Sequence, residues 1–255
     1  MFIPGLVSVT FRQLSPREII DLCVANSLKS IEWGGDVHVP PGDLAKARDV
    51  ATQTADAGLT SAAYGSYYRV FEKDGAPTEF TPFLETAVAL GIPTIRVWAG
   101  QRDSALVNDA DFIKLVDRLR QVADSAAKAE VQVALEFHGG TYTDNADSAI
   151  RLVNAVGHQN LQTLWQTPVG LPHPDCVESL RLCLGEVSNL HVFHWTANGD
   201  RLSLADALPD WDAYLDLLAT DPRPRHLLLE FVSDNDPANL PREAETLCSL
   251  IQQRK

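Results

Sequence analysis

Three apolar stretches of this sequence end in side chains that can bind a metal ion or move a proton. The stretches and their end groups are Val131–Leu135 with Glu136 and His138, Leu190–Phe193 with His194, and Leu227–Leu229 with Glu230. A short apolar run that stops at charged residues is typical of a buried strand with a polar site at its carboxyl end. The chemistry of this chain is therefore expected at the ends of its strands.

Glu136, His194 and Glu230 together offer two carboxylates and one imidazole. These groups suit a divalent ion of the Mn²⁺, Mg²⁺, Co²⁺ or Zn²⁺ kind, and we favour Mn²⁺. A carboxylate beside such an ion can remove a proton from the carbon next to a carbonyl that the ion polarises. We therefore predict a divalent metal ion as cofactor, and Glu136 and Glu230 as the catalytic acid–base pair.

The rest of the chain supplies the elements that must position these groups. Short apolar stretches alternate with amphipathic ones in eight units. The predicted strands are Leu6–Phe11, Ser30–Trp33, Leu59–Tyr64, Thr94–Trp98, Val131–Leu135, Leu161–Trp165, Leu190–Phe193 and Leu227–Phe231. The predicted helices are one that opens at Ser15, then Asp43–Ala57, Thr81–Leu90, Asp109–Ala129, Asn145–Val156, Cys176–Leu184, Trp211–Leu218 and Arg242–Gln253.

This alternation implies a parallel sheet with right-handed crossovers. Eight units in 255 residues predict an α/β protein with a single (β/α)₈ TIM barrel, one domain over residues 1–255. A doubly wound open sheet is the alternative, and the absence of G-x-G-x-x-G after the first strand disfavours it. In a barrel the carboxyl ends of all strands share one mouth. The groups expected there are Glu32, Trp33, Tyr64, Arg96, Trp98, Glu136, His138, Gln166, His194, Trp195 and Glu230.

The amino-acid composition restricts the classes of partner that this protein can bind. The chain has 34 acidic and 21 basic residues and a net charge of −13, which disfavours nucleic acid as a partner. No apolar stretch is long enough to cross a bilayer, so no membrane partner is expected. The four cysteines form no C-x-x-C pair. We therefore expect a cytoplasmic protein with free thiols, and the sequence leaves homo-oligomerisation open.

Four motifs resemble one known family: Arg96–Gly100, Leu135–His138, His191–His194 and Leu229–Phe231. The chain is similar over nearly its whole length to the xylose isomerase-like TIM barrels. That family includes sugar isomerases, ketose 3-epimerases, hydroxypyruvate isomerases, inosose dehydratases and, more distantly, endonuclease IV. The resemblance implies a metal ion bound at the ends of strands five to eight, by Glu136, Gln166, His194 and Glu230.

Gln166 departs from the family, which has an aspartate at this position. An amide oxygen can still bind a metal ion, but one negative charge is lost. We expect lower metal affinity or a more electrophilic ion. The resemblance also implies that His138 and Arg201 contact the substrate, because the family places polar residues just after strands five and seven.

Aromatic residues gather near the predicted strand ends. We expect six of these rings to form apolar walls for a sugar ring: Trp33, Tyr64, Tyr67, Trp98, Phe137 and Trp195. Of these, Trp33, Tyr64, Trp98 and Trp195 are predicted to bind the substrate, and packing beneath the loops is the alternative.

The leading interpretation is a metal-dependent sugar or keto-polyol isomerase or epimerase with a small carbohydrate substrate. The alternatives are a lyase that acts on a 3-keto sugar with the same groups, and a non-catalytic sugar-binding barrel. Endonuclease IV-like repair is disfavoured by the acidity and by too few ligands for several zinc ions.

Overall fold

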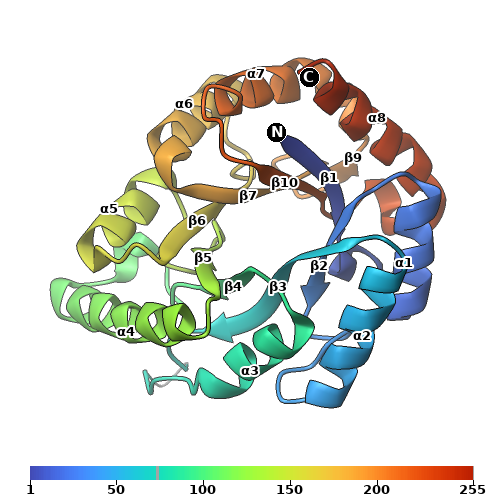
Figure 1. Ribbon diagram of the computed structural model, residues 1–255. Helices are drawn as coiled ribbons and strands as arrows, with labels where there is room; N and C mark the ends of the chain where they lie inside the picture. The colour runs from blue at the N-terminus through green and yellow to red at the C-terminus, as the bar shows by residue number, and fades with distance from the viewer. Residues whose placement is uncertain (73–74, 255) are drawn as a thin grey trace.

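A closed barrel of eight parallel strands forms the centre of the protein, and helices surround it (Figure 1). The computed structural model describes residues 1–72 and 75–254, and the eight strands are counted among these residues. The strands are β1 (Phe2–Val7), β2 (Ser30–Gly34), β3 (Thr60–Arg69), β4 (Thr94–Trp98), β5 (Gln132–Leu135), β6 (Leu161–Trp165), β7 (Val187–Val192) and β10 (Arg225–Leu229). Parallel pairing of β1 with β10 closes the ring, which confirms the predicted (β/α)₈ barrel over an open sheet.

The helices follow the strands in the predicted order. They are α1 (Pro16–Ala25), α2 (Leu44–Asp56), α3 (Thr81–Leu90), α4 (Asp109–Lys128), α5 (Ala146–Val156), α6 (His173–Cys183), α7 (Leu208–Leu218) and α8 (Leu240–Gln252). Short 3₁₀ turns are η1 (Ser8–Phe11), η2 (Ser104–Leu106), η3 (Leu184–Glu186), η4 (Leu204–Ala207), η5 (Ser233–Asn235) and η6 (Pro237–Asn239). No helix within the described residues is both long and apolar enough to cross a membrane.

Local sequence explains where several helices begin. The Ser15 backbone N–H donates to Glu18 Oε2 at 2.7 Å, and the Glu18 N–H donates to Ser15 Oγ at 3.4 Å. This capping box satisfies N–H groups at the start of α1, where Pro16 lacks one. Asn108 caps α4 in the same sense, because its side-chain oxygen accepts from the Asp111 N–H at 2.9 Å.

Several strands differ from the prediction, among them the first, the third, the seventh and the last. The first lies earlier, since Ser8–Phe11 turns into η1 instead of continuing β1, and the last ends at Leu229 instead of Phe231. The third is longer and contains a bulge, where its register against β4 shifts between Gly65 and Tyr68. Within this bulge Tyr67 adopts a left-handed conformation with φ 57°. A bulge redirects side chains, and this one lies at the carboxyl side of the barrel.

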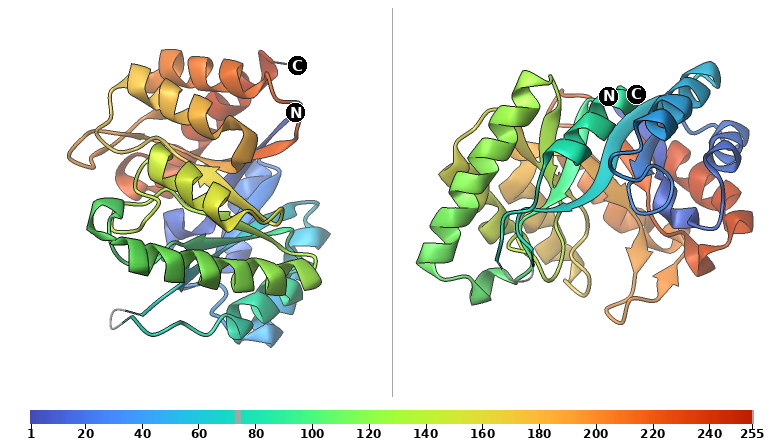
Figure 2. Two further views of the ribbon diagram at one scale, coloured as in Figure 1. Left: turned by 90° about the vertical axis from the view of Figure 1, so that its left-hand side faces the viewer. Right: turned by 90° about the horizontal axis from the view of Figure 1, so that it is seen from below.

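A small antiparallel ribbon of β8 (His194–Trp195) and β9 (Arg201–Leu202) was not predicted. Figure 2 shows both chain termini at one end of the barrel and this ribbon, in orange, at the other. The ribbon therefore adds a wall to the mouth formed by the carboxyl ends of the strands.

A buried arginine stabilises the opposite end. Arg225 begins β10, and its Nη2 lies 2.9 Å from Asp221 Oδ2. Its Nε donates to the Val187 carbonyl at 3.2 Å, and its side chain is 1% exposed. Asp221 also pairs with Arg223 at 2.6 Å. This cluster connects the start of β10 to the start of β7.

Replacing Asp221 with alanine should leave the Arg225 guanidinium buried without its carboxylate. We expect a loss of roughly 2 kcal/mol in the free energy of unfolding, below the roughly 3–5 kcal/mol of a fully buried pair because Asp221 is partly exposed. The melting temperature should fall by about 4–8 °C. Asp21→Ala, which removes the exposed partner of Arg17, is the control and should change it little. Equal shifts in both variants would show that the Arg225 cluster does not stabilise the barrel.

Candidate active site

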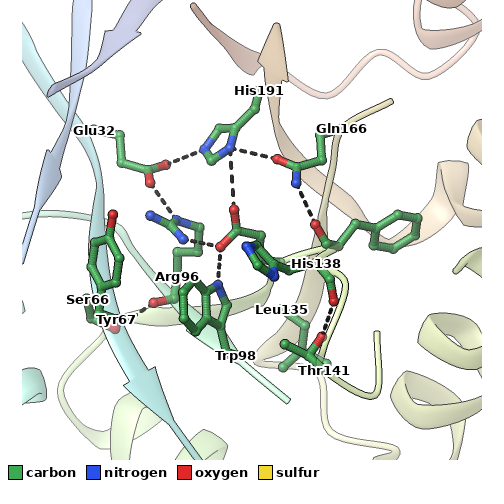
Figure 3. A network of polar contacts seen from close by, with 12 residues as sticks. Glu32, Ser66, Tyr67, Arg96, Trp98, Leu135, His138, Thr141, Gln166 and His191 are labelled. Carbon is green, nitrogen blue, oxygen red and sulfur yellow. Dashed lines mark hydrogen bonds and ion pairs between the residues drawn. The ribbon is translucent and has the colours of Figure 1, made fainter. Parts of the chain in front are cut away.

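Five ionisable side chains meet inside the mouth of the barrel, and all are buried. They are Glu32 of β2, Arg96 of β4, Glu136 after β5, His191 of β7 and Glu230 after β10. Figure 3 shows Arg96 between Glu32 and the indole of Trp98, and His191 between Glu32 and Gln166. Each member comes from a different strand, and together these strands lie around the whole ring, so the network requires a closed barrel.

Arg96 fixes two of the carboxylates. Its Nε lies 2.6 Å from Glu32 Oε1, and its Nη1 donates a hydrogen bond to Glu136 Oε2. The Trp98 indole N–H donates to the same Glu136 oxygen. Two donors therefore hold Oε2 of Glu136, and its Oε1 is the oxygen closer to His191, at 3.7 Å from Nδ1.

His191 connects the two sides of the barrel. Its Nε2 lies 3.2 Å from Glu32 Oε2, and its Nδ1 lies 3.2 Å from Glu230 Oε2. The amide oxygen of Gln166 is 3.0 Å from the same Nδ1, while the amide nitrogen of Gln166 donates to the Phe137 carbonyl at 2.5 Å. The Phe137 carbonyl therefore sets the orientation in which the Gln166 oxygen faces the site.

The opposite charges of the network stabilise one another's ionised forms. Burial by itself would raise the pKa of Glu32, but Arg96 and His191 lower it to about 2. Burial lowers the pKa of His191, yet Glu230 and Glu32 raise it to about 10. The pKa of Glu230 is also lowered, because His191 outweighs the effect of burial. Without a metal ion, His191 is therefore an imidazolium between ionised Glu32 and Glu230.

Three of these groups fit a divalent ion. Glu136, His191 and Glu230 each offer a ligand atom, and these atoms lie within 4.8 Å of one another. Two carboxylates and one imidazole match the preferences of Mn²⁺, Zn²⁺ and related ions, and Gln166 adds a neutral oxygen beside them. His191 must lose a proton before it can bind an ion, so binding would release a proton.

His194 does not join this group. Its Nδ1 lies 3.2 Å from the Ser203 carbonyl, and it lines a separate cavity of about 300 Å³ beside α6 and α7. The prediction placed the histidine at the end of the strand, but β7 ends at Val192. His191 lies inside β7 and points to the interior of the barrel. His194 lies beyond the end of β7, in β8, and does not share that orientation. The structure brings Glu136, Gln166 and Glu230 together with His191, not with His194.

A cavity of about 530 Å³ opens above the network. Of the predicted substrate contacts, Trp98, His138 and Trp195 line it, and Arg201 lies over the Trp195 ring with 5.6 Å to the centroid. Tyr67 and Phe137, two further rings of the predicted wall, line it as well.

The other two predicted contacts lie in the core. Trp33 is fully buried and packs edge-on against His38. The hydroxyl of Tyr64 donates to the Val39 carbonyl at 2.8 Å, and the residue is fully buried. Neither lines the cavity, so packing, the alternative interpretation, describes these two rings.

Mn²⁺ should raise the melting temperature, because the folded protein binds the ion and the unfolded chain binds it poorly. The stabilisation is about 2.7 kcal/mol when free ion exceeds Kd a hundredfold. His191→Ala should remove most of this increase, and His194→Ala should keep it. The comparison is the melting temperature with and without Mn²⁺ for each variant, so that any loss of intrinsic stability cancels. The reverse pattern would return the ligand role to His194.

Comparison with known proteins agrees with this geometry. The sequence model of the xylose isomerase-like TIM barrel family matches residues 20–250 of this chain. The 3-dehydroshikimate dehydratase of Bacillus anthracis is 35% identical over 128 residues, which cover 43% of this chain and 45% of that protein. The match thus spans less than half the length of that relative.

Solved structures share the fold at low sequence identity. The probable 3-DHS dehydratase of Bacillus anthracis has a TM-score of 0.80 and 19% identity, and the match covers 97% of this chain and 99% of that one. D-psicose 3-epimerase from Clostridium cellulolyticum H10 has a TM-score of 0.75 and 16% identity, with 98% of each chain covered. The 3-keto-D-glucoside 4-epimerase of E. coli has a TM-score of 0.75 and 15% identity, and the match covers 99% of this chain and 100% of that one. These relatives are enzymes, and the chain belongs to the xylose isomerase-like TIM barrel family.

Proposed function

We propose that this protein is a metal-dependent isomerase or epimerase that moves a proton at the carbon next to a carbonyl of a carbohydrate. One observation carries the proposal: Glu136 and Glu230 present two buried carboxylates to the same cavity, with His191 between them. Epimerases among the structural relatives support the same class.

The surroundings of Glu136 suit a proton acceptor. Arg96 and Trp98 both bind its Oε2, so that oxygen is a weakened base and the side chain has a fixed orientation. Oε1 lies 3.7 Å from His191 Nδ1 and accepts no hydrogen bond from a side chain that the structure describes, so it is the oxygen that can take the proton. When bound by Glu136, His191, Glu230 and Gln166, a divalent ion would stabilise negative charge on the substrate oxygens.

Glu230 supplies the second half of the reaction. Its Oε2 is held by His191 Nδ1 at 3.2 Å, and the side chain lines the same cavity as Glu136. Glu230 must carry a proton before it can act as the acid, and His191 Nδ1, 3.2 Å from its Oε2, can supply that proton. Its delivery to the other face of the carbon gives an epimer, while Glu136 keeps the proton it removed. Return of the abstracted proton by Glu136 to the neighbouring carbon gives an isomer.

A lyase is the second candidate, and the sequence match to a dehydratase favours it. The first step would be the same proton removal by Glu136 or Glu230. The electron pair would then expel a leaving group from the next carbon instead of accepting a proton.

Glu136→Gln and Glu230→Gln should each lower turnover by roughly 10²–10⁴-fold, because each removes a positioned acid or base and keeps the side-chain shape. Turnover is measured on keto sugars in deuterated water with added Mn²⁺, by NMR of the exchanging carbon. Loss of water or an alcohol from the substrate identifies a lyase. Metal content is measured in both variants, since loss of the ion would mimic loss of the base.

Glu243→Gln is the matched control. Glu243 is also buried, but it accepts hydrogen bonds from Ser203 and the Leu204 N–H, away from the network. Its turnover should stay near that of the unmodified protein. Near-normal exchange in both Glu136→Gln and Glu230→Gln would remove this pair from the mechanism.

A further inference from the structure

Three arginines lie over aromatic rings around the mouth of the cavity. The guanidinium carbon of Arg201 is 4.1 Å from the Phe231 ring centroid, and that of Arg12 is 5.5 Å from the same centroid. The guanidinium carbon of Arg69 is 3.8 Å from the centroid of Trp98. Phe231 and Trp98 line the cavity that contains Glu136 and Glu230. These three arginines are called the arginine rim below.

The arginine rim has more positive than negative charge. Arg12 binds Asp36 at 2.6 Å and donates to the Tyr67 hydroxyl at 2.6 Å. Among the residues that the structure describes, no carboxylate lies within 4.0 Å of the guanidinium nitrogens of Arg69 or Arg201. Three cations thus share one paired carboxylate, in a chain whose net charge is −13.

The rim also lies within electrostatic reach of the network below it. Burial lowers the pKa of Arg69, and the charge of Glu136 opposes that shift. Burial likewise lowers the pKa of Arg201, while Glu230 raises it and the nearby Arg12 lowers it. Arg12 and Arg201 therefore repel each other across the Phe231 ring, and an anion between them would relieve this repulsion.

The backbone is strained where it positions this rim. Phe231, directly after Glu230, has φ 51°, and Tyr67 has φ 57°. Both residues contact Arg12, one through its ring and the other through its hydroxyl. A left-handed aromatic residue is costly, and such strain persists where the surrounding structure requires it, commonly at binding sites.

We propose that the substrate carries an anionic group, a carboxylate or a phosphate, that binds at the arginine rim. This inference names the substrate class of the proposed function and rests on it. Arg12 already donates to Asp36, the Val9 carbonyl and the Tyr67 hydroxyl, so it contributes charge. Arg69 and Arg201 form no ion pair with the described residues, and the N–H edge of a guanidinium stacked on a ring matches two anionic oxygens.

The charges also orient the substrate. Glu136 and Glu230 would repel an anion placed on the floor of the cavity, and the rim attracts it. The carbonyl end therefore lies over the carboxylates, and the anionic end points outward to Arg201 and Arg12. This arrangement separates the group that anchors the substrate from the carbon that reacts.

Three probes with the same six-carbon chain test the proposal: D-glucitol, D-gluconate and D-glucitol 6-phosphate. Binding to the whole protein is measured by calorimetry at low and high salt, without turnover. At least one anionic probe should bind roughly tenfold or more tightly than D-glucitol, the size expected for charge-assisted hydrogen bonds. Salt should reduce this preference. The preferred anion distinguishes a carboxylate site from a phosphate site.

Arg201→Gln and Arg69→Gln should each reduce the preference for the anion. Arg181→Gln, which removes an exposed arginine paired with Glu178, should keep it. Equal affinity for all three probes, no detectable binding of either anion, or a preference that survives both rim substitutions would overturn the proposal. Because the readout is binding, missing proton exchange would count against the proposed reaction and leave this result standing.

Discussion

The buried guanidinium of Arg96 is the interaction on which the site depends. A buried charge is costly unless its partners are in place, and here Glu32 of β2 and Glu136 after β5 accept its hydrogen bonds. Space for it comes from Gly65 of β3. A Cβ at this position would lie 2.5 Å from Arg96 Nη2 and 2.7 Å from Glu32 Oε1. The absence of one side chain thus allows the ion pair that orients the Glu136 carboxylate.

The same interaction determines the charge of the site. Three carboxyl groups face one permanent cation and one histidine, and the position after β6 is a neutral amide. An additional carboxylate at Gln166 would make the cavity floor more negative. A neutral amide there lowers the cost of building negative charge on a substrate oxygen. The arginine rim extends this effect to the cavity mouth, against the negative charge of the chain as a whole.

Much of the architecture could be predicted, because the spacing of apolar residues along the chain differs between strands and helices. Glu136 and Glu230 could be found for the same reason, since each directly follows an apolar strand. The histidine prediction used the residue just beyond the strand, His194, whereas His191 inside β7 is the one that lies beside Glu136 and Glu230. The sequence does not show which of two histidines three residues apart faces the interior.

Other features have no local signal. The bulge at Gly65–Tyr68 extends β3 past a glycine that the sequence presents as a stop, so the position of Tyr67 inside this strand could not be seen. Trp33 and Tyr64 were assigned to the cavity by their place near strand ends, but Tyr64 donates to a loop carbonyl and Trp33 packs beneath that loop. The bond between Glu32 and His191 joins positions 159 residues apart, and no pattern in one sequence connects them.

The distribution of the network along the chain has a consequence for synthesis. Glu32, Arg96 and Glu136 belong to the first five strands and can pair with one another as soon as those strands have left the ribosome. His191 and Glu230 follow much later, and Glu32 meets His191 only when β10 has closed against β1. A nascent chain can therefore form its first ion pairs early, and the contacts of His191 and Glu230 follow last. The contact that completes the site is also the contact that marks a finished barrel.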